Sequence, residues 1–236
     1  MIKVTANGPA EVLNTTTFPT DFPRHGFLFI NWGPKRMLAL GGFDKDKKDT
    51  DTVFKYENGS WTKMGWKLEQ IQYGGGACTY NDKLAIVGGL AHDLTDPEFE
   101  PSTTIDKMVI HDLSNNGAIL KKVTITGDVD TTVCHNGTVY AFTSEYKKPN
   151  KYYSYDLTKM DTDMTEITDP GIEEGALGVV HGQLSLFGGT DVKTGEAPTT
   201  YKVFNEAAGN WTDIPFEQYG TVRGGQGFYN FVVVEK

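Results

Sequence analysis

A chain of 236 residues is long enough for one large all-β domain or for two average domains. It carries 31 Asp and Glu against 22 Lys and Arg, a formal net charge of −9, and it has no basic cluster, which argues against binding to nucleic acid. The most apolar segment, Phe228 to Val234, is only strand-sized and is interrupted by Asn230, which argues against membrane insertion. The 27 Gly and the 12% aromatic residues indicate many short strands joined by turns.

The first predicted elements are two N-terminal strands over residues 2–6 and 11–16, separated by the turn Asn7-Gly8-Pro9. The residues before this turn lack the apolar core of a signal peptide. This leaves two interpretations open, a cytoplasmic chain and a mature secreted chain.

One short apolar segment then recurs along the chain. Near copies are Met37-Leu-Ala-Leu-Gly-Gly42, Leu84-Ala-Ile-Val-Gly-Gly89 and Leu184-Ser-Leu-Phe-Gly-Gly189, and degenerate copies cover residues 139–144 and 231–236. The fifth positions of these segments, 41, 88, 143, 188 and 235, are 47, 55, 45 and 47 residues apart. Such a spacing is typical of a repeat architecture with five units.

Each repeat contains the pattern of four strands. A second apolar stretch and a tight polar turn, such as Asn136-Gly137, precede the recurring segment, and such turns link hairpin strands because their residues tolerate positive φ. Two further stretches with period-two alternation follow it, for example 52–57 and the stretch around Trp61.

These units predict a single all-β domain over residues 1–236, a five-bladed β-propeller with four antiparallel strands per blade. Strands from both termini are expected to share the fifth blade and so to close the ring. The predicted boundaries are 24–66 for blade 1, 73–127 for blade 2, 129–168 for blade 3, 174–215 for blade 4, and 1–19 plus 222–236 for blade 5.

The repeat resembles the kelch repeat over nearly the whole chain. The resemblance rests on two apolar strands ending in Gly-Gly and on an aromatic residue ahead of a Trp, as in Tyr56 to Trp61 and Phe204 to Trp211. It implies a propeller, although six or seven blades are more familiar in kelch relatives. Blade 3 lacks both the glycines and the Trp, and blade 2 lacks the Trp.

In a propeller, the loops between the second and third strands and those between blades emerge on one face, where binding residues concentrate. Four residues at blade entries are candidates for ligand binding at the mouth of the central channel: Arg24, Tyr73, Glu174 and Arg223. Two converging arginines suit a carboxylate, a sulfate or an acidic peptide. The competing interpretation is that each Arg ties neighbouring blades together and that Glu173 and Glu174 are its ion-pair partners.

The longest loop on this face, residues 91–101, contains two prolines together with Asp96, Glu98 and Phe99, and it is a candidate partner loop or a solvated insertion. Residues 44–51 hold four carboxylates interleaved with three lysines and lack the spacing of an EF-hand, so a solvated loop is favoured over a metal site. No known catalytic motif is present, and no catalytic residue, metal or cofactor is predicted.

Four sequons, at Asn14, Asn58, Asn136 and Asn210, are candidate glycosylation sites and favour a secreted or extracellular protein. The alternative is that turns select Asn-Gly for its conformation. The cysteines, Cys78 and Cys134, lack metal or redox spacing, so buried thiols are favoured over a single disulfide.

The sequence therefore favours a non-catalytic binding scaffold that recognises a protein or a carbohydrate through the loop face. A sugar-processing, epimerase-like enzyme with a pocket at the channel mouth is the first alternative, because some kelch relatives are epimerases or copper oxidases. The second alternative is an intracellular kelch adaptor that binds an acidic peptide. The sequence does not set the oligomeric state.

Overall fold

The computed structural model describes residues 2–3, 11–12, 18–23, 25–46, 48, 50–70, 74–91, 103–145, 148–160 and 163–215. Within these ranges the chain is all-β, with four antiparallel sheets of four strands, three pairs of short strands and no helix.

Each four-stranded sheet follows chain order from its innermost to its outermost strand. The first sheet is β3 (Leu28–Asn31), β4 (Met37–Leu40), β5 (Thr52–Glu57) and β6 (Ser60–Lys67); the second is β7 (Gly76–Tyr80), β8 (Lys83–Val87), β11 (Lys107–Asp112) and β12 (Ala118–Thr124); the third is β13 (Asp128–His135), β14 (Thr138–Glu145), β15 (Lys148–Asp156) and β16 (Thr165–Ile167); the fourth is β18 (Ala176–Val180), β19 (Gln183–Phe187), β21 (Thr200–Asn205) and β22 (Asn210–Pro215). The short pairs are β1 (Ile2–Lys3) with β2 (Glu11–Val12), β9 (Leu90–Ala91) with β10 (Thr103–Thr104), and β17 (Ile172–Glu173) with β20 (Thr190–Asp191).

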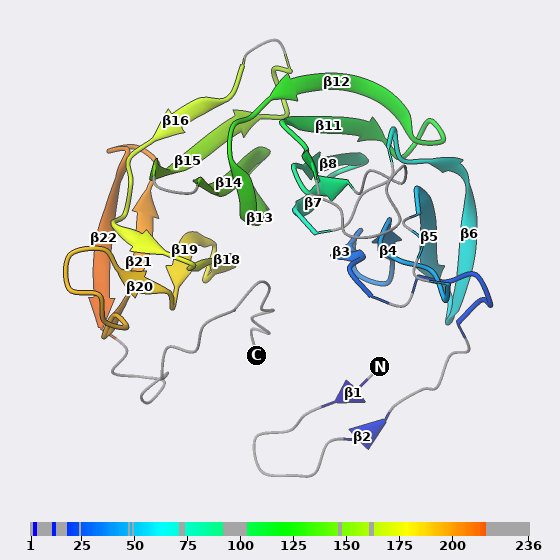
Figure 1. The fold of residues 1–236 in the computed structure, drawn as a ribbon, viewed down its shortest axis with the longest axis horizontal. Coiled ribbons are helices and arrows are strands. Elements are labelled where there is room, and N and C mark those ends of the chain that lie inside the picture. Colours follow the sequence, from blue (N-terminus) through cyan, green and yellow to red (C-terminus); the bar gives the residue numbers. More distant parts are fainter. Residues whose placement is uncertain are drawn as a thin grey trace.

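The four sheets stand side by side in an arc (Figure 1), with β3, β7, β13 and β18 on the inside and β6, β12, β16 and β22 on the outside. Innermost strands of neighbouring sheets are in contact along the whole arc. The four-stranded antiparallel sheets expected from the repeat are therefore present. The N-terminal strands pair with each other, Ile2 opposite Val12, whereas residues 222–236 of the predicted fifth blade lie outside the described residues.

The core lies between the sheets, because each strand supplies alternate side chains to two neighbours. In β8, Leu84 and Ile86 pack with residues of the first sheet such as Leu40, whereas Ala85 and Val87 pack with the third sheet. A third layer joins Phe142 and other residues of the third sheet to the fourth. Burial on both faces explains why the recurring segment is a continuous apolar run rather than an alternating one.

The paired glycines mark a close approach between two backbone segments. A Cβ atom on Gly42 would lie 2.7 Å from the carbonyl oxygen of His25, and one on Gly189 would collide with the carbonyl oxygen of Glu173. In the third sheet, where Thr143 and Ser144 replace the glycines, the partner segment supplies Gly127 instead, and its Cβ atom would lie 2.8 Å from the Ser144 carbonyl. The degenerate repeat therefore keeps the contact and moves the glycine to the other side.

A disulfide joins Cys78 on β7 to Cys134 on β13, with 5.4 Å between their Cα atoms. The expectation of two buried thiols is therefore wrong. Both cysteines point into the layer between the second and third sheets. Sequence spacing gives no hint of this pairing, because it arises from the contact between two innermost strands that are 56 residues apart.

Replacing Gly189 with alanine is expected to destabilise the protein more than replacing Gly195. Both glycines have positive φ, +77° and +69°, so each substitution costs about 1–2 kcal/mol of backbone strain. Only Gly189 faces a neighbouring backbone, whereas nothing lies within 4 Å of a Cβ atom at Gly195, so Gly189→Ala should cost roughly 2 kcal/mol more. Denaturant titration measures both free energies of unfolding, and equal losses would contradict the proposed close approach.

Candidate functional site

The structure describes one of the four residues predicted at the channel mouth. Glu174 is exposed and has φ +55°, a left-handed conformation that costs a non-glycine residue about 1 kcal/mol. Pairing of the preceding Glu173 with Thr190 fixes this turn at the end of the fourth sheet. Arg24, Tyr73 and Arg223 lie outside the described residues, as do Asp96, Glu98 and Phe99 of the predicted partner loop.

Asp130, on the innermost strand β13 of the third sheet, is a further candidate residue near Glu174 that sequence reasoning missed. It is the bulged residue of β13, where the register shifts between Val129 and Thr131. Burial raises the pKa of the Asp130 carboxyl to about 6, a hydrogen bond with the Ser144 hydroxyl lowers it, and the charges of Asp128 and Glu174 raise it further. Its Oδ2 atom is buried and has no hydrogen-bond partner. Unsatisfied buried acceptors are uncommon in proteins and are costly to maintain.

The described part of the mouth is acidic. Asp128 accepts a hydrogen bond of 2.7 Å from the Thr104 hydroxyl, and its charge and that of Glu174 act on Asp130. No Lys or Arg among the described residues lies within ion-pairing distance of Asp130 or Glu174. The predicted pairing of Glu174 with the two arginines therefore stays a prediction.

The described carboxylates of loop 44–51 bind the loop backbone or neighbouring lysines, and Asp51 accepts hydrogen bonds of 2.9 Å from Lys67. Asp44 Oδ1 accepts hydrogen bonds from the backbone N–H groups of Asp46 and Lys48, at 2.8 and 2.9 Å. The ammonium group of Lys45 contacts the Asp46 carboxylate at 2.9 Å, and both side chains are exposed. Over the part of the chain that the structure covers, no cluster of three His, Cys, Asp or Glu side chains has the arrangement of a metal site.

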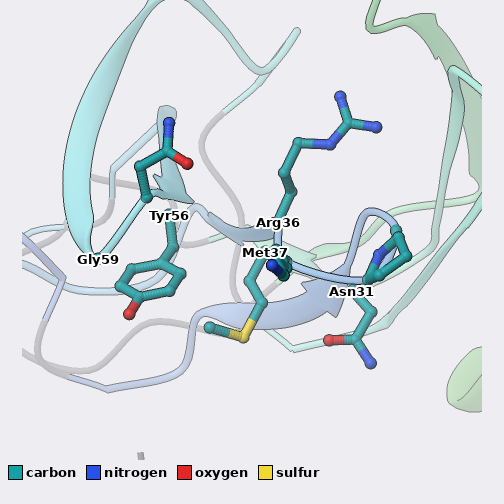
Figure 2. A pocket seen from close by; sticks show the side chains of 9 residues that line it. Asn31, Arg36, Met37, Tyr56 and Gly59 are labelled. Carbon is teal, nitrogen blue, oxygen red and sulfur yellow. The ribbon is translucent and has the colours of Figure 1, made fainter. Parts of the chain in front are cut away.

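The opposite end of the sheets, which we call the turn face, carries the hairpin turns between first and second and between third and fourth strands. A hollow of about 290 Å³ lies there between the two turns of the first sheet. Figure 2 shows the side chains of Met37 and Tyr56 on one side of this hollow and that of Arg36 directed the other way. The Arg36 guanidinium lies 4.1 Å from the ring centre of Trp32.

Three of the four predicted glycosylation sites are described and exposed. Asn58 and Asn136 occupy turn positions with φ of 51° and 47°, each followed by a glycine, and Asn210 opens β22. Turn geometry alone is sufficient to select Asn-Gly at the first two sites. Asn14 lies outside the described residues.

No family model matches this chain, and a comparison with curated proteins finds no match. A search of the described residues finds no helix that is long and apolar enough to cross a membrane.

The raised pKa of Asp130 predicts a pH-dependent stability. Because the folded pKa of about 6 exceeds the ordinary value of 3.8, the folded state binds more protons between these pH values, and stability falls as pH rises from about 4 to about 6. Asp130→Asn should abolish this loss, which amounts to at most about 3 kcal/mol. Urea titrations from pH 4 to pH 8 measure the slope.

Ser144→Ala provides the opposite control, because the lost hydrogen bond should raise the pKa of Asp130 further and steepen the fall in stability. Identical pH profiles for the native protein and Asp130→Asn would contradict the assignment.

Proposed function

We propose that the protein is a non-catalytic binding scaffold, a kelch-like propeller that recognises a protein or carbohydrate partner through its loop face. The observation that carries this proposal is the buried, unpartnered Oδ2 atom of Asp130 beside the strained, exposed Glu174. A bound partner that donates a hydrogen bond would satisfy the Asp130 oxygen. Strained and unsatisfied groups that persist in a folded protein cluster at functional sites.

Closure of the ring with a fifth blade is part of the proposal. It is supported by the face of the first sheet that is turned away from the second sheet. Phe29 of β3 remains 54% exposed there, and its ring centre lies 5.8 Å from that of Trp61. On the fourth sheet, the stacked rings of Phe187 and Tyr201 occupy the face turned away from the third sheet. A fifth blade from residues 1–19 and 222–236 would bury both faces and remove the free edges.

A secreted, glycosylated form is the proposed location. The disulfide between Cys78 and Cys134 supports it, because such bonds persist mainly in oxidising compartments, and it weighs against the intracellular adaptor. The exposed sequons agree with this location.

Intact-mass analysis of protein from its native source tests the location. We expect added glycan mass that falls in the recombinant triple variant Asn58→Gln, Asn136→Gln, Asn210→Gln, which keeps only the Asn14 sequon, and no free thiol before reduction. Unmodified asparagines together with two free thiols would favour the intracellular alternative.

Loop-face recognition is tested on arrays of neutral and acidic glycans and of lysine-rich and aspartate-rich peptides. Because the described mouth is acidic, we expect binding to hydroxyl-rich glycans or to basic peptides, with a loss of at least tenfold in Asp130→Asn and in Glu174→Gln. Glu166→Gln, which removes one carboxylate charge on the outermost strand β16, is the matched control and should bind normally.

Binding that is unaffected by Asp130→Asn and Glu174→Gln would overturn the proposal. The enzyme alternative keeps one supporting observation, since a carboxyl with a pKa of about 6 is suited to general acid–base catalysis. Turnover of acidic sugars that is abolished in Asp130→Asn would favour that alternative.

A further inference from the structure

The turn face carries a repeated apolar contact between neighbouring sheets. An aromatic residue at the end of the innermost strand packs toward the next sheet in two of the sheets. This residue is Trp32, directly after β3, in the first sheet and Tyr80, the last residue of β7, in the second. There it shares a core cluster with a buried leucine, Leu113 in the second sheet and Leu157 in the third. Trp32 Nε1 also donates a hydrogen bond of 3.2 Å to Asp82 of the second sheet. An aromatic ring and a leucine thus close these two interfaces at the turn face.

The equivalent places between the third and fourth sheets are occupied by His135 and Glu206. Leu157 follows Asp156, whose Oδ1 atom accepts a hydrogen bond from the backbone N–H of Thr158 at 2.8 Å. Glu206 follows Asn205, whose Oδ1 atom accepts one from Ala207 at 3.1 Å, so the same kind of turn places it. An imidazole and a carboxylate therefore replace an apolar pair that the protein uses twice elsewhere, and such departures from a local rule mark functional sites.

The two side chains meet at a polar junction. His135 Nε2 lies 3.6 Å from Glu206 Oε1, and the hydroxyl of the buried Tyr140 donates a hydrogen bond of 3.1 Å to the same oxygen. Burial and the neighbouring carboxylate raise the pKa of Tyr140, so its phenol stays a donor. The Asn136 amide lies 2.9 Å from His135 Nε2. Glu206 is thereby fixed through one oxygen.

The Glu206 side chain is 43% exposed, whereas that of His135 is only 10% exposed. Among the residues that the structure describes, no Lys or Arg lies within 4.0 Å of the Glu206 carboxylate. A held carboxylate that has no Lys or Arg partner among the described residues is therefore available to solvent, and it favours ligands with hydrogen-bond donors over anions.

Two hollows flank this carboxylate and share Glu206 and Phe204 in their walls. The larger, about 520 Å³, is also lined by the amides of Asn136 and Gln183, the hydroxyl of Thr212 and the ring of Tyr201. The smaller, about 370 Å³, lies between the turn ends of the third and fourth sheets. Each volume is in the range of small-molecule sites in proteins.

We propose that the larger hollow binds a neutral saccharide. The Glu206 carboxylate can accept two sugar hydroxyls, and the amide of Gln183 and the hydroxyl of Thr212 can each donate and accept a hydrogen bond. The negative charge disfavours phosphorylated and acidic sugars. This site lies on the turn face, so the inference does not rest on the proposed loop-face function.

Glu206→Leu is the sharpest test, because it restores the residue that the protein itself uses at Leu113 and Leu157. Titration calorimetry with neutral gluco-, manno- and galacto-configured trisaccharides should detect binding of at least one of them to the native protein. In Glu206→Leu we expect affinity to fall at least tenfold while the thermal midpoint of unfolding is unchanged or higher. Glu166→Gln, which changes a carboxylate outside the lining of the larger hollow, should bind like the native protein.

If Glu206→Leu fails to fold, Gln183→Ala carries the same expectation, since this side chain is exposed at the rim of the hollow. The proposal is overturned if no trisaccharide binds at millimolar concentration, or if binding survives these substitutions. It is also overturned if spermidine, a polyamine probe, binds at this site in preference to every sugar, because the ligand class would then be cationic.

Discussion

The contact between neighbouring sheets is the constraint on which the rest of the structure depends. A four-stranded sheet in this arc has two faces to bury. The second strand of a sheet, such as β8, therefore lies between two apolar layers, one on each face. Such a strand is apolar at nearly every position, and the backbone pleat directs successive side chains into opposite layers. The strand must also end abruptly where another backbone segment approaches it, and a glycine on one of the two segments permits that approach.

The interface between the third and fourth sheets departs most from this plan. Its middle is rich in aromatic residues, with the rings of Phe142 and Tyr152 stacked 4.5 Å apart. Its two ends are polar, with Asp130 near the loop face and Glu206 at the turn face. Both polar groups are held by hydroxyls of the third sheet, those of Ser144 and Tyr140. The most irregular repeat in the sequence thus supplies Asp130 and the two hydroxyls that hold the polar groups of this interface.

Much of the fold was predictable from the sequence, because strands and turns are encoded by local periodicity. The recurring segment at 37–42 and the Asn136-Gly137 turn each indicate an element without any knowledge of its neighbours. The disulfide depends instead on which faces of two distant strands oppose each other. Asp130 was missed because a bulge, which alternation does not predict, reorients its side chain. Glu206 was missed because nothing in the sequence marks its position as equivalent to those of Leu113 and Leu157. The equivalence becomes visible only from the contacts that each residue makes with the innermost strand of the preceding sheet.

The covalent bond between the second and third sheets also determines how the protein responds to mechanical force. The disulfide closes a loop of 56 residues that contains the end of β7, the strands β8, β11 and β12 of the second sheet, and most of β13. A chain pulled at its two ends can unravel the first and fourth sheets, but the force then passes through the sulfur atoms and bypasses this loop. Without reduction, the fully extended chain is shorter by about 190 Å, at roughly 3.4 Å per residue. Most of the second sheet is thereby shielded from tension that the first sheet, the fourth sheet and the strands β14 to β16 of the third sheet must bear.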